Sequence, residues 1–225
     1  MRNEILWFIM MFINFLMVIL AFKFFKKTGL YVLIPISVIL ANLQTIVTLH
    51  LFGFIATLGN IVYGIGFLAT DILSEEYGKK EADKGVYIGF FTLIVFTSLM
   101  FVCTRFNLID NAGPFRTMYG IMPRIAIASL VAYLFSNKHD TWSFEFWKKR
   151  FPKHLWIRNN FSTIISQLID TITFTIISFY GILTFKEMFE LCIFTYILKV
   201  IVALCDTPFI YIIKKMANRN GKEQV

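Results

Sequence analysis

Charged and amide side chains interrupt the long apolar runs of this sequence. An ionised group at the centre of a bilayer costs about 3 kcal/mol on insertion scales, so such groups usually face a protein interior and mark a ligand or ion path. Amide side chains can bind a ligand through both their donor and their acceptor atoms. The candidate binding residues of these two kinds are Asn42, Gln44, Asp71, Glu75, Arg124, Gln167, Asp170, Lys199 and Asp206.

Helical spacing brings some of these charges together. Asp71 and Glu75 are four residues apart, which places their side chains on one face of a helix. Lys199 and Asp206 are seven residues apart, so two turns separate them on one stripe. Two interpretations stay open for the cations Arg124 and Lys199: they line a ligand path, or they neutralise buried carboxylates as structural ion pairs. For Asp71, the alternative to a binding role is a hydrated position at a helix end.

The apolar stretch at residues 54–74 combines Asn60 with three glycines, Gly59, Gly64 and Gly66. Each glycine weakens a helix by about 1 kcal/mol relative to alanine. Broken spans often line transport sites, because their freed backbone groups can bind solute. We therefore expect this stretch to form one wall of a binding site.

The residue groups of a membrane enzyme are missing from the sequence. The three histidines are dispersed, there is no HExxH or GxSxG motif, and the three cysteines form no CxxC pair or metal-ligand pattern. Asp71 with Glu75, or Asp170 with Asp206, could form a carboxylate pair for hydrolysis, so a membrane-embedded enzyme stays a remote alternative. We expect no catalytic residue, no metal and no cofactor.

The composition places the chain among integral membrane proteins. Of its 225 residues, 57% are hydrophobic and only 16% are charged, whereas about a quarter of the residues of a soluble domain are charged. A helix needs about 20 mostly apolar residues to cross a hydrocarbon core of about 30 Å. The stretches that meet this requirement lie at residues 5–25, 30–52, 54–74, 85–104, 119–137, 161–183 and 191–213.

The distribution of positive charge indicates the orientation. With the N-terminus outside, 16 of the 22 Lys and Arg residues fall in cytoplasmic segments and 4 in outer segments, and cytoplasmic loops carry such an excess. The net charge of +8 therefore lies in loops and does not indicate a nucleic-acid partner. We predict an all-α integral protein of the cytoplasmic membrane with seven spans, the N-terminus outside and the C-terminus inside.

The connection at residues 138–160 contains six cations and six aromatic residues. This composition is typical of a segment that lies in the lipid headgroup region. Docking of a cytoplasmic partner is the alternative interpretation.

Four runs of the sequence resemble a known family. They are FLATDILSEEYGKKEA at 67–82, PRIAIASLVAYL at 123–134, HLWIRNNFSTIISQLIDT at 154–171 and YILKVIVALCDTPFIY at 196–211. Together they are similar to the queuosine-precursor transporters of the vitamin uptake transporter family, over roughly residues 30–215. The positions of the family motifs correspond to Thr70, Asp71, Glu75, Arg124, Asn160, Gln167, Asp170, Lys199 and Asp206.

The resemblance implies a six-helix core at residues 29–217, similar to the substrate-binding components of energy-coupling-factor transporters. An additional helix and a basic turn would precede it at 1–28, and a cytoplasmic tail would follow at 218–225. The implied substrate is a 7-deazaguanine base, either the 7-cyano or the 7-aminomethyl compound or queuine, imported for transfer RNA modification. Asp170 is then expected to bind the base edge, and Asp71 or Glu75 to provide a second anchor.

The resemblance leaves two mechanisms open. The chain alone could import the base by alternating access or facilitated diffusion. Alternatively, it could be the binding component of an energy-coupling-factor importer that needs separate ATPase and coupling subunits. The partners expected besides the substrate are the lipid bilayer and either such subunits or further copies of the chain.

Overall fold

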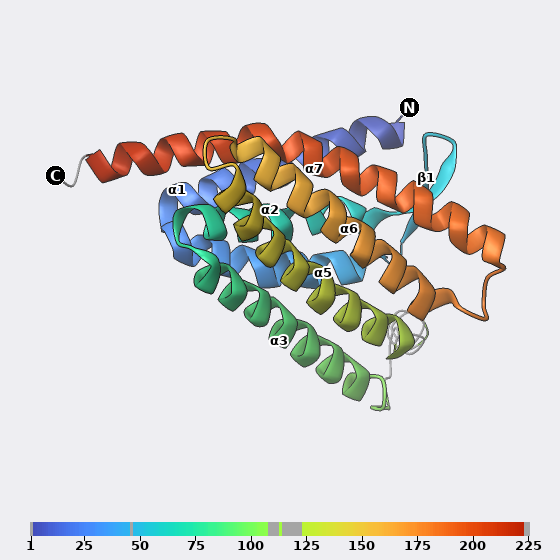
Figure 1. Ribbon diagram of the computed structural model, residues 1–225. Coiled ribbons are helices and arrows are strands. Elements are labelled where there is room, and N and C mark those ends of the chain that lie inside the picture. Colours follow the sequence, from blue (N-terminus) through green and yellow to red (C-terminus); the bar gives the residue numbers. More distant parts are fainter. Residues whose placement is uncertain (1, 46, 108–112, 114–122, 223–225) are drawn as a thin grey trace.

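Figure 1 shows a computed structural model of the chain, which describes residues 2–45, 47–107, 113 and 123–222. Long helices dominate these residues, and one short β-hairpin accompanies them. The elements in chain order are α1 (Arg2–Thr45), β1 (Thr48–Leu51), β2 (Phe54–Thr57), the 3₁₀ turn η1 (Leu58–Asn60), α2 (Tyr63–Glu76), α3 (Lys79–Cys103), α5 (Pro123–Arg150), α6 (Leu155–Phe179) and α7 (Phe185–Lys222).

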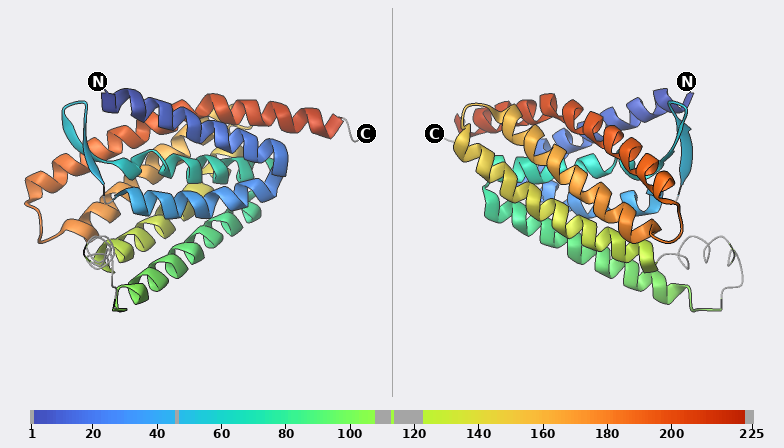
Figure 2. Two further views of the ribbon diagram at one scale, coloured as in Figure 1. Left: turned by 180° about the vertical axis from the view of Figure 1, so that it is seen from behind. Right: turned by 45° about the vertical axis from the view of Figure 1, so that its right-hand side comes forward.

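Helix α1 consists of two helices that meet at Lys26, where φ is 54° and ψ is −132°. The chain reverses direction at this residue (Figure 2). Gly29 permits the tight turn, because a Cβ at this position would collide with the carbonyl group of Ala21. The two expected spans at 5–25 and 30–52 therefore correspond to the two halves of α1, except that the second half already ends at Thr45.

The expected span at residues 54–74 is not a continuous helix. Its first part is strand β2, which pairs with β1 in antiparallel register with Leu51 opposite Phe54. Positive φ values of 49° at Phe52 and 85° at Gly53 produce the turn between the strands. Only α2 is α-helical, and its 14 residues extend about 21 Å, less than the hydrocarbon core. The hairpin corrects the prediction that residues 54–74 form a helical span, whereas the rest of the described chain is helical as predicted.

The connection at 138–160 was expected in the headgroup region but is largely helical. Helix α5 continues to Arg150, and α6 begins at Leu155. On α5, Asp140 and Phe144 are fully buried while Trp142 is 57% exposed. This end of α5 is therefore amphipathic: one face packs into the helix bundle, and Trp142 and Phe146 lie on the exposed face.

Within the described residues, the helices that are long and apolar enough to cross a membrane are α1, α3, α6 and α7 up to Ala217. Many large apolar side chains on these helices face outward, for example Phe12, Phe91 and Leu99, which are each more than half exposed. Such a surface is typical of contact with lipid. The structure is consistent with a multi-pass membrane protein. The expected fifth span begins at residue 119, outside the described residues, and the count of seven spans stays a prediction.

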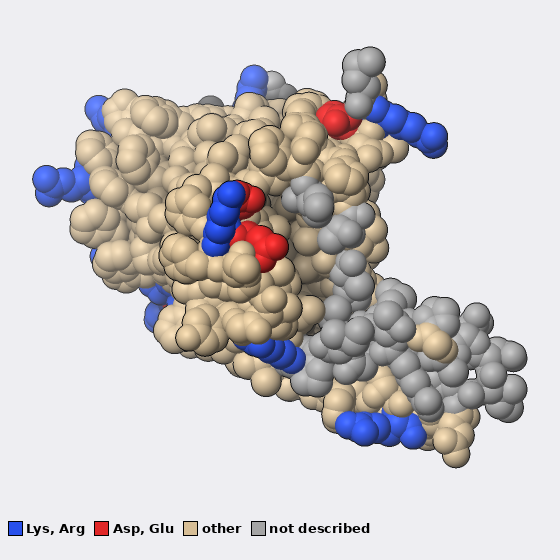
Figure 3. Space-filling model, turned by 90° about the vertical axis from the view of Figure 1, so that its right-hand side faces the viewer, with Lys and Arg blue, Asp and Glu red and all other residues tan. Residues whose placement is uncertain are grey.

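The segments expected in the cytoplasm all lie at one end of the bundle. The turn at Lys26, the α2–α3 and α5–α6 connections and the C-terminal end of α7 gather there (Figures 1 and 2). An ion pair joins two of these segments, with Lys27 Nζ 3.2 Å from a carboxylate oxygen of Glu81. The opposite end shows few charged side chains (Figure 3). We call the end at which these segments gather the basic end. The side of the membrane that it faces remains a prediction.

Candidate functional site

Helix α6 carries a continuous stripe of buried polar residues along its whole length. On its other face, Phe161, Ile165 and Ile176 are at least 40% exposed. A helix in water would bury its apolar face, so this inverted pattern indicates lipid outside and a polar interior. The buried stripe consists of Asn159, Asn160, Ser162, Thr163, Ser166, Gln167, Asp170, Thr171, Thr175 and Ser178.

An ion pair between α6 and α7 lies within this interior. Lys199 Nζ donates to Asp170 Oδ2 at 2.5 Å, and each side chain is only 5% exposed. Ser136 on α5 donates to Asp170 Oδ1 at 3.1 Å. The Lys199 ammonium group also lies 4.8 Å from the ring centre of Tyr63 on α2, at the distance of a cation–π contact. Of the two interpretations left open for Lys199, the structure therefore shows an ion pair.

Two further carboxylates face the interior without a cation. Asp206 on α7 accepts a hydrogen bond from Asn159 Nδ2 at 2.8 Å. Asp71 on α2 accepts one from Thr163 Oγ1 at 3.1 Å. Both side chains are at most 1% exposed, and no Lys, Arg or His among the described residues forms an ion pair with either. Asp71 is therefore a buried interior group and not a hydrated helix end.

A hollow lined by buried residues lies between η1, α2, α6 and α7. Its empty volume is about 200 Å³, divided into gaps that are narrower than a water molecule. Three of its polar atoms, Asn60 Nδ2, Gln167 Oε1 and Asp206 Oδ2, are buried without a hydrogen-bond partner in the described part of the chain. Buried polar groups normally have partners, so these atoms are suited to a ligand. The lining residues are Asn60, Gly64, Thr163, Gln167, Lys199, Val202, Ala203 and Asp206.

A second charged cluster fastens the helices at the basic end. Glu75 on α2 accepts hydrogen bonds at Oε1 from Arg158 of α6 and Lys214 of α7. Lys148 of α5 lies 3.5 Å from Glu75 Oε2 and donates to the carbonyl of Ser74 at 2.8 Å. Burial raises the pKa of Glu75, but the hydrogen bond from Lys214 and the nearby cations lower it by more than burial raises it. The pKa of Glu75 therefore lies below its ordinary value. We call these four ionic side chains the Glu75 cluster.

The family described as "Putative vitamin uptake transporter" matches residues 57–213. This chain belongs to the vitamin uptake transporter family. The match runs from the end of β2 into α7, so it includes every element that lines the hollow. It also includes Glu75, Lys148 and Arg158 of the Glu75 cluster, whereas Lys214 lies one residue beyond the match.

Two relatives in this family carry the name "Probable queuosine precursor transporter". The one from Bacillus subtilis (strain 168) is 40% identical over 221 residues, which are 96% of each chain. The one from Haemophilus influenzae (strain ATCC 51907 / DSM 11121 / KW20 / Rd) is 28% identical over 153 residues, 67% of this chain and 63% of that protein. No solved structure matches the chain. These relatives support a transport role across a membrane.

Other residues that the sequence and the family motifs predicted do not line the hollow. Thr70 donates to the carbonyl of Phe67 on its own helix, and Asn42 donates to that of Val38. The Gln44 side chain carries a buried oxygen without a hydrogen-bond partner in the described residues.

Asn160 and Arg124 connect helices. Asn160 donates to Thr207 Oγ1 of α7 at 2.7 Å. Arg124 is exposed and lies apart from the carboxylates: its guanidinium group donates to the carbonyls of Ile177 and Tyr180. These carbonyls are at the C-terminal end of α6, where a cation offsets the helix dipole. As substrate-binding residues, all of these positions stay predictions.

Sequence analysis missed the interior residues Asp140, Arg158, Asn159 and Thr163. The first three were placed in a cytoplasmic connection, because the apolar run ends at Asn137. One signal could have revealed two of them: Asn159, Thr163 and the predicted Gln167 recur every four residues on α6. Asp140 had a weaker signal of the same kind, since it follows the buried Ser136 by four residues.

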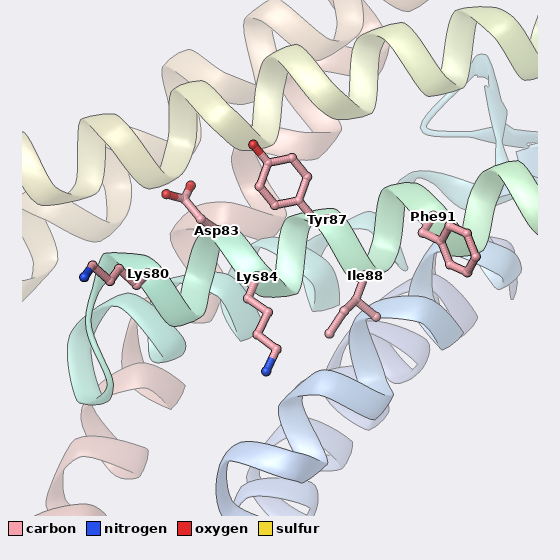
Figure 4. A pocket seen from close by; sticks show the side chains of 6 residues that line it. All are labelled: Lys80, Asp83, Lys84, Tyr87, Ile88 and Phe91. Atoms are coloured by element: carbon pink, nitrogen blue, oxygen red, sulfur yellow. The ribbon is translucent and has the colours of Figure 1, made fainter.

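A different hollow lies outside the bundle on α3, between α1 and α5 (Figure 4). All of its lining residues come from this one helix, so it is an open groove. Asp83 and Tyr87 point toward α5, while Lys84 and Ile88 point toward α1 (Figure 4). A mainly apolar groove with cations at one end is typical of a lipid-facing surface near the headgroups, and we do not assign it to substrate.

Proposed function

We propose that this member of the vitamin uptake transporter family imports a queuosine precursor, a 7-deazaguanine base, across the cytoplasmic membrane. The observation that carries the proposal is the hollow between η1, α2, α6 and α7, whose lining residues combine unpaired donors and acceptors with a carboxylate. The names of the two relatives support the same substrate class.

The chemistry of the hollow fits a guanine-like edge. Such a base presents N1–H and a 2-amino group, both of which one carboxylate can accept, while its O6 needs a donor. Asp206 Oδ2 is an unpaired acceptor on the wall of the hollow, and Asn60 Nδ2 is an unpaired donor. Gln167 Oε1 is a further acceptor for a ring N–H group.

Asp206 is a better partner for the base edge than Asp170, which the sequence had suggested. Both oxygens of Asp170 are already occupied, one by Lys199 and the other by Ser136. Only one oxygen of Asp206 is occupied, by Asn159. We therefore assign recognition of the base to Asp206 and regard the pair of Asp170 with Lys199 as a fixed wall beside it.

The narrow gaps in the hollow indicate that the helices must separate to admit a base. In transporters of the alternating-access type, parts of the bundle move around a fixed midplane site. The Glu75 cluster ties α2, α5, α6 and α7 together at the basic end. Opening toward the cytoplasm would therefore require this cluster to break. In this arrangement the base enters from the opposite end and leaves through the basic end.

We further propose the membrane arrangement that the charge distribution predicted. The chain crosses seven times with the N-terminus outside, and the third passage consists of β2, η1 and α2. Residues 29–217 form the transport core, 1–28 an additional helix with a basic turn, and 218–225 a cytoplasmic tail. Each half of α1 supplies one passage.

A binding measurement tests the substrate assignment. The purified chain in detergent is heated with 7-cyano-7-deazaguanine, 7-aminomethyl-7-deazaguanine or queuine, because a ligand that binds the folded state raises the apparent Tm. Asp206→Asn, which replaces an acceptor by a donor, should weaken binding of the base at least tenfold. Glu190→Gln is the matched control, since Glu190 is exposed in an ion pair with Lys186. A wild-type chain whose Tm responds to none of the three bases would refute the proposal.

Uptake by cells that express only this chain tests whether it acts alone. Accumulation of a labelled base without added proteins supports the solitary importer. Uptake that requires separate ATPase and coupling subunits would instead show that the chain is the binding component of an energy-coupling-factor importer. Homo-oligomerisation can be measured in the same preparation by light scattering.

A further inference from the structure

Three buried carboxyl groups from three helices lie near one another, and one of them lines the hollow. They belong to Asp71 on α2, Asp140 on α5 and Asp206 on α7, and each side chain is at most 1% exposed. The carboxyl groups of Asp71 and Asp140 are within interaction distance of each other, and Asp206 is close enough for its charge to act on both. We call this group the acid triad. Neither the motifs nor the family resemblance had included Asp140.

The triad has only neutral hydrogen-bond partners among the described residues, including the hydroxyl groups of Ser162, Thr163 and Ser166 beside Asp140. Four of its six oxygens, namely Asp71 Oδ1, both oxygens of Asp140 and Asp206 Oδ2, accept no well-formed hydrogen bond from the described residues. None of the three acids has an ion pair within that part of the chain, whereas Asp170 has one with Lys199. Uncompensated negative charge is expensive to bury. The cluster therefore needs a positive species from outside the chain.

The amide group of Asn159 is an independent sign of a missing donor. Asn159 is fully buried, and its Nδ2 is held against Asp206 by a hydrogen bond of 2.8 Å. Its Oδ1 is also buried and has no hydrogen-bond partner among the described residues. Buried polar atoms normally have hydrogen-bond partners. An unpaired acceptor on a residue that contacts Asp206 therefore favours a bound species that donates a hydrogen bond or is positive.

A proton fits this site better than a metal ion. In the described residues, no three His, Cys, Asp or Glu side chains converge in the manner of a metal site. Two carboxyl groups in contact in a medium of low dielectric cannot both ionise, so they share one proton, which makes one of them a donor to the other. The carboxyl groups of Asp71 and Asp140 are close enough to share a proton in this way.

The other ionisable groups around the triad have their own partners. On α5, His139 Nδ1 is 2.9 Å from the hydroxyl of Ser166. Below Asp71 on α2, Glu75 is bound by the cations of the Glu75 cluster.

On α3, Asp83 accepts from Thr141 and pairs with Lys79 and Lys138. On α6 and α7, Asp170 and Lys199 pair with each other. None of these groups is therefore available to neutralise the triad, which leaves its charge to be set by protons.

We propose that the acid triad is a proton-binding site coupled to the substrate hollow, so that the transporter carries a proton together with the base. Asp206 supplies the coupling, because it belongs to the triad and also lines the hollow. This inference rests on the proposed function. When the Asp71–Asp140 pair holds its proton, less negative charge acts on Asp206, and the helices α2, α5 and α7 can close around the base. Loss of the proton restores the repulsion and favours opening.

Transport into liposomes that contain only the purified chain tests the coupling. The probe is labelled 7-cyano-7-deazaguanine, because its cyano group does not itself bind a proton at neutral pH. An inward proton gradient should drive accumulation of the base, by about tenfold for a difference of one pH unit if one proton accompanies each base. An inward sodium gradient at constant pH should drive none. Accumulation under the sodium gradient alone, or no effect of the proton gradient, would overturn the proposal.

The variant Asp140→Asn separates proton coupling from substrate binding. Asp140 does not line the hollow, so the variant should still bind the base and exchange labelled for unlabelled base across the liposome membrane. It should no longer accumulate the base under a proton gradient. The control Glu190→Gln should accumulate the base as the wild type does. Full gradient-driven accumulation by Asp140→Asn would remove the triad from the mechanism.

A direct proton measurement keeps the test decisive if Asp140→Asn does not fold. Wild-type protein in weakly buffered detergent solution is mixed with the base, and a pH indicator follows protons taken up on binding. A change at neutral pH that Asp71→Asn abolishes supports the triad, and no change in the wild type overturns it. Failure of the proposed function would look different, because the wild type would then neither bind nor exchange the base.

Discussion

Lys199 and Asp170 form an ion pair between α7 and α6, with 2.5 Å between Nζ and Oδ2 and only 5% of either side chain exposed. The hydroxyl of Ser136 and the ring of Tyr63 complete their surroundings. Breaking a buried pair by removal of one partner leaves the other charge uncompensated, and this costs about 3–5 kcal/mol. Removal of both charges avoids that cost.

The pair therefore predicts a specific pattern of stabilities. Lys199→Met and Asp170→Leu, each alone, should lower the Tm of the purified chain strongly. The double variant should recover most of the loss, because neither unpaired charge remains. Differential scanning fluorimetry in one detergent measures all four proteins. Additive losses in the double variant would show that the two side chains stabilise the fold independently.

The Glu75 cluster predicts a pH dependence of stability. The pKa of Glu75 is lowered in the folded state relative to its ordinary value of 4.5. Folding therefore gains stability from the ionised form above that ordinary value, and the gain is lost as the pH falls through the lower, folded pKa. Glu75→Gln should lower stability at pH 7 by about 2 kcal/mol, the scale of a hydrogen bond to a charged group.

The acid limb of the stability curve provides the test. Tm is measured from pH 7 to pH 3 for the wild type, for Glu75→Gln and for the exposed control Glu190→Gln. The decline of the wild type below pH 4.5 should be smaller in Glu75→Gln and unchanged in the control. If the Glu75→Gln curve runs parallel to that of the wild type, titration of Glu75 does not contribute to acid unfolding.

Gly64 predicts a steric test of the hollow. A Cβ at this position would lie 2.5 Å from Val202 Cγ1, and both residues line the hollow. Gly64→Ala should therefore force α2 and α7 apart and reduce base uptake by about tenfold, the effect of a free-energy change of about 1.4 kcal/mol. Adding Val202→Ala removes the clash and should restore uptake. Val202→Ala alone is the control, and a double variant as inactive as Gly64→Ala would contradict the steric explanation.

Periodicity made the polar face of α6 predictable. Gln167 and Asp170 were recognised because charge and amide groups inside an apolar run are rare, and the helical repeat alone places them on one face. Lys199, the partner of Asp170, was found on the same ground. The pairing itself was left open, since spacing along one helix does not specify which residue of another helix lies opposite.

Tertiary packing decided the features that the sequence did not predict. Asp140 stands in a stretch of cations and aromatic residues, so its local surroundings resemble a membrane interface, although helix packing buries it completely. The interruption after Thr45 depends on contacts that are distant in sequence: a Cβ at Gly59 would collide with the Ala41 carbonyl and the Thr45 hydroxyl. Hydropathy averages over such contacts and therefore counted residues 54–74 as one span, although the three glycines indicated a weakened helix.

Site-directed labelling tests the proposed orientation of the bundle. In a background with Cys103, Cys192 and Cys205 replaced by alanine, single cysteines are introduced by Lys186→Cys and Lys149→Cys, both at exposed positions. Lys186 lies in the first turn of α7, away from the basic end of the bundle. Lys149 lies in the last turn of α5, at the basic end. A membrane-impermeant maleimide applied to intact cells should label only Lys186→Cys, because an excess of positive charge keeps the basic end in the cytoplasm. After the cells are broken, both cysteines should react. Labelling of Lys149→Cys in intact cells would show the opposite orientation. Opening of the Glu75 cluster would then release the base to the outside.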